Sequence, residues 1–207
     1  MKITDPFRRF LRDTEDHQMS VLLDHGIYRH LRFKAPGTGM YWFDVITWPG
    51  SLTINGDMGS YTFSRLEDMF EFFGGREPGY VNKGYWAEKL VAVDKQSPAK
   101  EFDEDLFTLR VLEDFWEQRE DFEPAEARQI WEAIREQIFD EYAFRYTAHQ
   151  CHELLNHFVS PIPGFGYSDS WEWGSFDDYG IHFVWCLHAI THAIRTYRAT
   201  QQEVAAA

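Results

Sequence analysis

The chain has 207 residues, with 34 acidic and 20 basic side chains, a net charge of −14 and an aromatic content of 17%. This composition is too apolar for a disordered chain, and the length is sufficient for one sizeable hydrophobic core. The negative charge disfavours direct binding of nucleic acid or of anionic membranes, and it favours a basic partner.

The compartment is indicated by the cysteines and by the start of the chain. Cys151 and Cys186 lie in apolar, helix-like sequence, which favours reduced buried thiols over a disulfide framework. The first residues, MKITDPFRRF, lack the apolar segment of a signal peptide. The longest apolar run, near residues 181–190, is interrupted by two histidines and is too short to span a bilayer. We therefore expect a cytoplasmic protein.

A helix is predicted over residues 5–24, because Asp5 suits an N-cap, Pro6 suits the first helical position and Gly26 suits the end. Residues 27–34 alternate between apolar and polar side chains, as a half-buried strand does. A loop rich in glycine then leads into the next strand, so these two strands are expected to pair.

The most organised stretch contains three strand-like runs, at residues 41–48, 51–54 and 60–63. Pro49-Gly50 separates the first two runs. Asn55-Gly56 follows the second and is typical of a two-residue hairpin turn with positive φ at both positions. Together with residues 27–34, these runs predict a four-stranded antiparallel meander.

The rest of the chain, from about residue 80 to residue 200, reads as mainly helical. Ser64 and Glu67 have the spacing of a capping box, which predicts a short helix that ends at Gly74-Gly75. Further helices are expected over residues 82–93, from Asp103, from Pro124, and over residues 149–158 and 178–198. The helix from Asp103 is expected to bury Leu106, Leu109, Leu112, Phe115 and Trp116. We predict a single α+β domain over residues 1–207, in which residues 1–75 form a helix, the meander and a short helix packed against the sheet.

Four strings of this sequence occur in the same order in a known group of proteins. They are WPGSLTINGDMGSYTFSRLEDMFEFF, YWAEKLVAVD, EFDEDLF and HFVWCLHAI. With them the chain resembles a family of uncharacterised bacteriophage, prophage and actinobacterial proteins, over roughly residues 30–195. The family has no assigned activity, so the resemblance implies no catalytic residues. It implies a small accessory protein that acts in the cytoplasm of a bacterial host, where such proteins often bind or inhibit host machinery, including host immunity.

Residues 101–141 hold 15 acidic and 4 basic side chains, a net charge of −11. The helices here bury apolar stripes, so the acids are expected to face outward, among them Glu113, Glu117, Glu132, Glu136 and Asp140. One interpretation is a solvated face that aids solubility. The other is a surface that copies the charge of a nucleic-acid backbone and occupies the basic groove of a host protein.

The irregular segment 160–180 interleaves acidic side chains with large rings, notably Trp171 and Trp173 beside Asp169 and Glu172. Such a loop either clamps a cationic or sugar-like ligand or is held on the core by its aromatic rings.

Four histidines are candidate metal ligands. His188 and His192 are four residues apart on one predicted helix, the spacing of helical zinc sites, and His149 and His152 share a face of another. Two facing helices could supply two ligands each; the alternative is that each ring packs at a helix interface. The Asp57 loop, between glycines, reads as a turn and not as an active loop.

Two functions follow from these observations. The first is a non-enzymatic protein, without cofactor, that binds a basic host protein through its acidic helical surface. The alternative is a small hydrolase, with or without a metal ion, that uses the C-terminal histidines. No motif specifies the oligomeric state.

Overall fold

The computed structural model describes residues 5–140 and 147–206 of the chain. The chain divides into two compact units, each with its own buried core. Unit 1 comprises the chain up to Lys100 and again from Tyr179 onward, and unit 2 comprises Glu101–Asp178. This differs from the single continuous domain expected from the sequence. The division depends on the return of the last helix to the first half of the chain, and local sequence patterns do not record such a long-range contact.

Unit 1 is built on a six-stranded sheet whose strands follow one another in chain order, with every neighbouring pair antiparallel. The strands are β1 (Gln18–His25), β2 (Tyr28–Lys34), β3 (Phe43–Trp48), β4 (Ser51–Gly56), β5 (Gly59–Ser64) and β6 (Leu90–Val93). The predicted α+β class and meander order are confirmed. The predicted number of four strands is wrong, because both edge strands come from segments that we assigned to helices.

The edge strand β1 occupies the second half of the expected first helix. That helix, α1 (Pro6–Asp13), begins as predicted but ends at Asp13. In β1, Val21 and Leu22 are 44% and 51% exposed, and the pairing with β2 shifts between Val21 and Leu23. The strand therefore has neither a buried face nor a regular alternation, which are the two patterns by which a strand is found in sequence.

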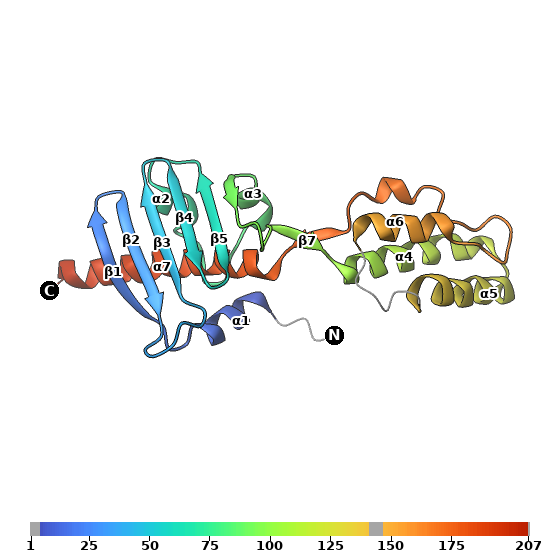
Figure 1. Ribbon diagram of the computed structural model, residues 1–207, viewed down its shortest axis with the longest axis horizontal. Helices are drawn as coiled ribbons and strands as arrows, with labels where there is room; N and C mark the ends of the chain where they lie inside the picture. Colours follow the sequence, from blue (N-terminus) through green and yellow to red (C-terminus); the bar gives the residue numbers. More distant parts are fainter. Residues whose placement is uncertain (1–4, 141–146, 207) are drawn as a thin grey trace. The chain divides into compact units, whose positions relative to one another are not determined.

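The helices of unit 1 pack on one face of the sheet. α7 (Ile181–Ala206) runs across the strands, and α1 and α2 (Met69–Phe73) lie beside it (Figure 1). Every second side chain of the central strands points into this layer and is buried: Leu31, Phe33, Phe43, Val45, Leu52, Ile54, Tyr61 and Phe63. Phe10 of α1 meets Trp185 of α7 edge to face, with 5.1 Å between ring centroids. Aromatic rings from helices and strands thus fill the core of unit 1.

The turn between β4 and β5 is not the one predicted. Gly56 pairs with Gly59, so the two turn residues are Asp57 and Met58, and neither has a positive φ. The predicted turn at Asn55-Gly56 is wrong by two residues. Gly56 is instead the last residue of β4, where it is in close contact with the backbone of Trp42 and Phe43 at the start of β3. Its small size, and not its conformational freedom, is what the position requires.

Other local predictions are confirmed in part. Pro49-Gly50 joins β3 to β4, with Gly50 at φ 78°. The short helix α2 ends at Gly74 as expected, but its N-cap is Asp68 and not Ser64, which belongs to β5. Asn82 caps α3 (Lys83–Ala87), at the start of the helix expected over residues 82–93. The expected helix then stops, and residues 90–93 form β6.

Unit 2 is mainly helical. Its elements are α4 (Glu104–Gln118), α5 (Pro124–Ile134), the π-helical turn η2 (Arg135–Phe139), α6 (Ala148–His157) and the short 3-10 turns η1 (Arg119–Asp121) and η3 (Ser170–Trp173). The predicted helix starts are confirmed, and the Asp103 carboxylate accepts a hydrogen bond from the Leu106 amide at 3.0 Å. The buried stripe predicted for α4 is wrong except for Phe115: the buried residues are Phe107, Val111 and Phe115.

The chain enters unit 2 through β7 (Lys100–Phe102) and returns through β8 (Asp177–Tyr179), and these two strands pair with each other. Within residues 5–140 and 147–206, no helix is both long enough and apolar enough to cross a membrane.

Candidate functional site

The outward face of α4 combines apolar and acidic side chains. We call Leu109, Glu113, Trp116 and Glu117 the α4 stripe. Glu113 lies four residues after Leu109, and Trp116 and Glu117 lie three and four residues after Glu113, so all four share one side of the helix. The buried residues of α4 have the same spacing on the opposite side. The hydrophobic pattern of α4 therefore has two apolar faces, of which packing in unit 2 covers only one.

The apolar members of the α4 stripe are open to solvent, since Leu109 is 50% exposed and Trp116 is 52% exposed. The guanidinium of Arg119 lies over the Trp116 ring, 3.3 Å from its centroid, and limits the orientations of the ring. Glu113 is paired with Arg110 at 3.1 Å, and Glu117 is exposed. A half-exposed tryptophan flanked by carboxylates is suited to bind an apolar pocket with a basic rim.

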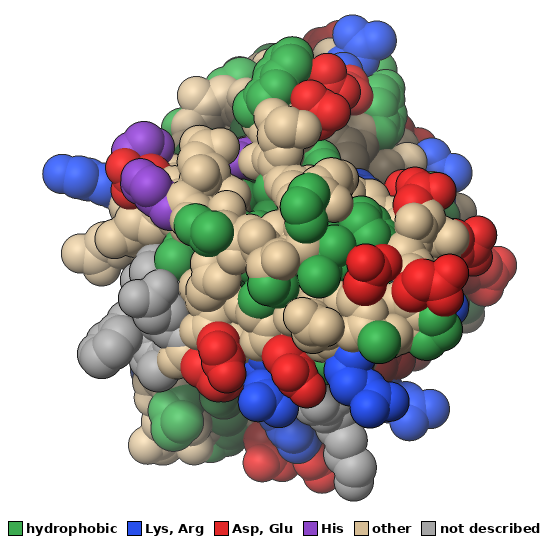
Figure 2. Space-filling view, turned by 90° about the vertical axis from the view of Figure 1, so that its right-hand side faces the viewer, with side chains coloured by type: hydrophobic (Ala, Val, Ile, Leu, Met, Phe, Trp, Pro, Cys, Tyr) green, Lys and Arg blue, Asp and Glu red, His purple; other side chains and the backbone are tan. Residues whose placement is uncertain are grey.

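The α5 acidic row, which we define as Glu132 of α5, Glu136 of η2 and Asp140 directly after η2, is exposed along its whole length. Ile134 of α5 and Ile138 of η2 point to the other side and are fully buried. Figure 2 shows Asp and Glu side chains in several separate groups, with hydrophobic and basic side chains between them. On this face the negative charge therefore borders apolar surface and does not form one continuous ridge.

The irregular segment 160–180, which we call the aromatic loop, carries two tryptophans with different roles. Trp171 is 70% exposed, so it is available to a partner. Trp173 packs against Tyr167 and Phe176, with ring centroids 5.8 and 6.3 Å away, so it holds the loop on the core of unit 2. Of the two tryptophans proposed as partner contacts, only Trp171 has the exposure that such a role requires.

A small polar pocket that we did not predict lies next to the α4 stripe. It measures about 170 Å³ and is lined by Asp114, Gln118, Gly164, Gly166, Tyr167, Ser168, Asp169, Ser170 and Trp173. Burial raises the pKa of Asp114, and the carboxylates of Glu117 and Asp169 raise it further, while a hydrogen bond from Gln118 lowers it. Two carboxylates beside an aromatic ring form a site for a cationic group, which would relieve their mutual repulsion. Asp114 gave no sequence signal, because only the fold brings the loop to α4.

His188 lies in the core of unit 1, and His192, one turn further along α7, is half-buried. His188 is 3% exposed, its ring lies 5.3 Å from that of Phe7, and the His192 ring lies 5.4 Å from that of Phe10. Burial lowers the pKa of each imidazole to about 4. Both rings are therefore neutral near pH 7, and both pack against phenylalanine rings of α1.

The other two histidines belong to unit 2. His149 is 82% exposed and lies 3.5 Å from Glu153, and Nε2 of His152 lies 2.9 Å from the carbonyl oxygen of Gly174. Within the described ranges, no three His, Cys, Asp or Glu side chains are grouped so that they could hold a metal ion.

Comparison with known proteins adds no relative: no protein-family model, no curated protein and no solved structure matches the chain.

Proposed function

We propose that the chain is a non-enzymatic binding protein that engages a basic protein surface through unit 2. In the context implied by the resemblance, the partner is a bacterial host protein, and binding at a basic groove that handles nucleic acid would inhibit it. The observation that carries the proposal is the half-exposed Trp116 within the α4 stripe, next to Glu113 and Glu117. Binding energy at interfaces concentrates in such aromatic anchors, and the surrounding charges set specificity and association rate.

The Asp114 pocket supplies a second point of contact. It adjoins the stripe because Asp114 and Glu117 lie on the same helix, and its carboxyls face a volume of about 170 Å³. A lysine or arginine side chain from the partner would place a cation between Asp114 and Asp169, beside the Trp173 ring. The pocket, the stripe and the α5 acidic row together provide one apolar anchor and several anionic contacts, which is the complement of a basic surface with an apolar hollow.

The hydrolase alternative is supported by no observation of this structure. Of its four candidate histidines, His188 is buried in the core of unit 1, His192 is half-buried, and His152 is 2.9 Å from a backbone carbonyl oxygen. The binding proposal is therefore the one that we test.

The first test removes the apolar anchor. A partner is captured from a bacterial lysate and purified, and its affinity is then measured for wild type and for Leu109→Ala/Trp116→Ala. We expect the double variant to bind more weakly by about 2 kcal/mol or more, because a central aromatic anchor is lost. Its free energy of unfolding should change by about 1 kcal/mol or less, since both side chains are half exposed.

The matched control is Leu22→Ala/Tyr28→Ala, which removes two side chains of similar exposure, 51% and 46%, from unit 1. This control should bind as wild type does. Equal affinity of the stripe variant and this control would contradict the proposal.

The second test reverses the charge of the α5 acidic row. Changing Glu132, Glu136 and Asp140 to Lys should alter the unfolding free energy by about 0.5 kcal/mol at most, because all three side chains are exposed. Association with the basic partner should become slower, since attraction is replaced by repulsion. Wild-type association should also slow as salt rises and the Debye length falls to about 8 Å, and the variant should lose this dependence.

The control for the charge reversal changes Glu15, Asp16 and Glu67 to Lys, which alters the net charge equally at exposed positions of unit 1. It should retain most of the association rate. If both triple variants associate as fast as wild type, the α5 acidic row serves only solubility.

A further inference from the structure

The strand β1 forms a long open edge of unit 1. It lies at one end of the six-stranded sheet, and among the strands that the structure describes it pairs with β2 alone (Figure 1). Seven of its eight residues are exposed, whereas β6 at the other edge has only four residues. An unpaired edge presents a row of backbone N–H and C=O groups, which can pair with a further strand.

β1 has few of the features by which proteins protect such an edge. Its sequence, QMSVLLDH, contains no proline and no lysine, and Val21, Leu22 and Leu23 at its centre are half exposed. Its one carboxylate, Asp24, accepts a hydrogen bond from the Gln201 side chain of α7. The bulge at Leu22 shifts the pairing with β2 but does not end it, because the two strands are paired on both sides of it. The edge is therefore long, apolar at its centre and open to association.

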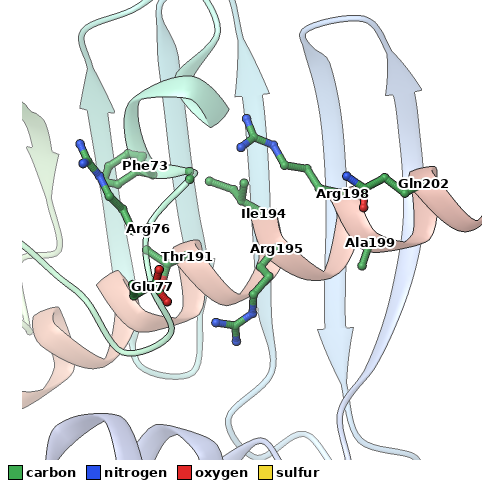
Figure 3. Close-up of a pocket in the computed structure, with 11 residues that line it drawn as sticks. Phe73, Arg76, Glu77, Thr191, Ile194, Arg195, Arg198, Ala199 and Gln202 are labelled. Carbon is green, nitrogen blue, oxygen red and sulfur yellow. The ribbon is translucent and has the colours of Figure 1, made fainter.

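α7 continues past this edge. Gln201 lies 3.1 Å from Asp24, so the helix passes β1 at that point, and Figure 3 shows the neighbouring Gln202 at the edge formed by the blue strands. Five more residues follow Gln201 up to Ala206, and all of them are exposed. At about 1.5 Å per residue they extend roughly 7 Å, which exceeds the spacing of about 4.8 Å between neighbouring strands. The helical layer therefore covers the place that a seventh strand would occupy.

The end of α7 presents an apolar side chain to that place. Val204 is 70% exposed. It lies seven residues after Tyr197 and three after Gln201, and these two residues both bond to Asp24 of β1. Residues at this spacing share one side of a helix, so Val204 is on the side of α7 that faces the sheet. In a single chain no strand lies opposite it, since β1 is the edge.

The chain's own β1 has the features that a seventh strand requires. When two β1 strands pair antiparallel about a two-fold axis, their apolar centres lie opposite each other and the two Asp24 carboxylates lie towards opposite ends. Unit 1 holds 14 acidic and 15 basic side chains, so the negative charge of the chain belongs to unit 2. Two copies of unit 1 can therefore approach each other without net repulsion.

We propose that two copies of the chain associate through their β1 strands and join their sheets into one. Met19 and Val21 lie opposite buried residues of β2, so they point to the helical layer. In the dimer, the end of α7 of the second copy, with Val204, lies over them. Each copy supplies both a strand edge and a helix end, so a single closed two-fold contact covers both. This inference concerns unit 1 and is independent of the function proposed for unit 2.

Sedimentation velocity of the full chain over a range of protein concentrations tests the proposal. We expect wild type to pass from monomer to dimer as its concentration rises. Leu22→Lys/Leu23→Lys should raise the dissociation constant of the dimer about tenfold or more, because lysines of the two copies are brought close together at the edge. Both side chains are half exposed, so the variant should remain folded. A wild-type chain that stays monomeric throughout would overturn the proposal.

The matched control is Leu11→Lys/Leu66→Lys. It adds the same charge at two leucines of unit 1 outside β1, which are 42% and 43% exposed. This control should dimerise as wild type does. Equal dissociation constants of the two double variants would show that β1 is not the interface.

Cysteine cross-linking locates the two-fold axis. Cys151 and Cys186 are buried, so a cysteine introduced on an edge strand supplies the accessible thiol. An antiparallel two-fold pairing brings a residue near the centre of β1 opposite its own copy, at a separation that a disulfide can span. With a mild oxidant, Val21→Cys or Leu22→Cys should form a disulfide between chains, and Val91→Cys on β6, at a position that is 64% exposed, should not. Cross-linking through β6 and not through β1 would contradict the proposed edge.

A variant outside β1 tests the contribution of α7. Val204→Asp should weaken the dimer several-fold, because it places a charge against the apolar side chains of the added strand, and the exposed position leaves the monomer folded. Ala199→Asp adds the same charge at an exposed position two residues before Gln201, on the opposite side of the helix, and should have little effect. Equal dissociation constants of these two variants would overturn the reciprocal contact on which the choice of a second copy rests.

Discussion

Lowering the pH from 7 to 4.5 is expected to reduce the unfolding free energy of unit 1 by about 3–5 kcal/mol, mainly through His188 and His192. Burial lowers the pKa of each ring to about 4 in the folded chain, while an unfolded histidine titrates near 6.5. The unfolded state therefore binds more protons in this range. The stability is fully present above pH 6.5, falls as the pH drops towards 4 and is lost below it. The change in unfolding free energy would be measured by urea titration at each pH, with hydrogen exchange in peptides of α7 as the readout.

The variant His188→Leu/His192→Leu identifies the source of this pH dependence. Leucine has a similar volume and does not titrate, so the decline between pH 6.5 and 4.5 should become much shallower. His25→Leu, at an exposed position of the same unit, should leave the decline unchanged. An undiminished decline in the double variant would show that other groups cause it. The effect of Asp44 and Asp68 can be separated from that of the histidines. The pKa values of these two carboxyl groups are lowered, so the stability that they contribute is lost at more acidic pH.

Replacing Gly56 with alanine is expected to destabilise unit 1 by about 3 kcal/mol or more. The added Cβ would lie 2.2 Å from the carbonyl oxygen of Trp42 and 2.8 Å from Cα of Phe43, so backbone must move between two paired strands. Neither of these atoms belongs to a flexible side-chain end that could turn aside. The midpoint of urea unfolding, compared with wild type at neutral pH, measures the effect.

Gly39→Ala is the matched control for this substitution. Gly39 has no positive φ, and a Cβ there meets no atom within 4 Å, so alanine should be nearly neutral. A Gly56 variant as stable as the Gly39 variant would contradict the close strand contact.

The sequence predicted those parts of the fold that local chemistry determines. Pro49-Gly50, Asp103 and Pro124 mark a turn and two helix starts because their effects act on the next few residues. β1 was missed because its side chains are exposed and its alternation is broken by a bulge. No local rule would have found it, since its support comes from pairing with β2 and from contacts with α7, such as the hydrogen bond from the Tyr197 hydroxyl to Asp24.

The candidate site shows the same limit. α4 carries two apolar series, one through Phe107, Val111 and Phe115 and one through Leu109 and Trp116. Either could have been the buried one, and the choice depends on which side α5 and the aromatic loop cover. The sequence thus located the acidic helices correctly and placed Trp116 in the core, whereas it lies half exposed in the structure.

The insertion of unit 2 between β6 and α7 affects how the chain can fold during synthesis. Translation produces all six strands of the sheet, then the whole of unit 2, and only then α7. Until α7 emerges from the ribosome, the apolar face with Leu31, Phe33 and Val45 lacks the helix that covers much of it, and such surfaces attract chaperones or other nascent chains. Unit 2 has its complete set of residues first, so unit 2 is expected to fold before unit 1 although its sequence begins later.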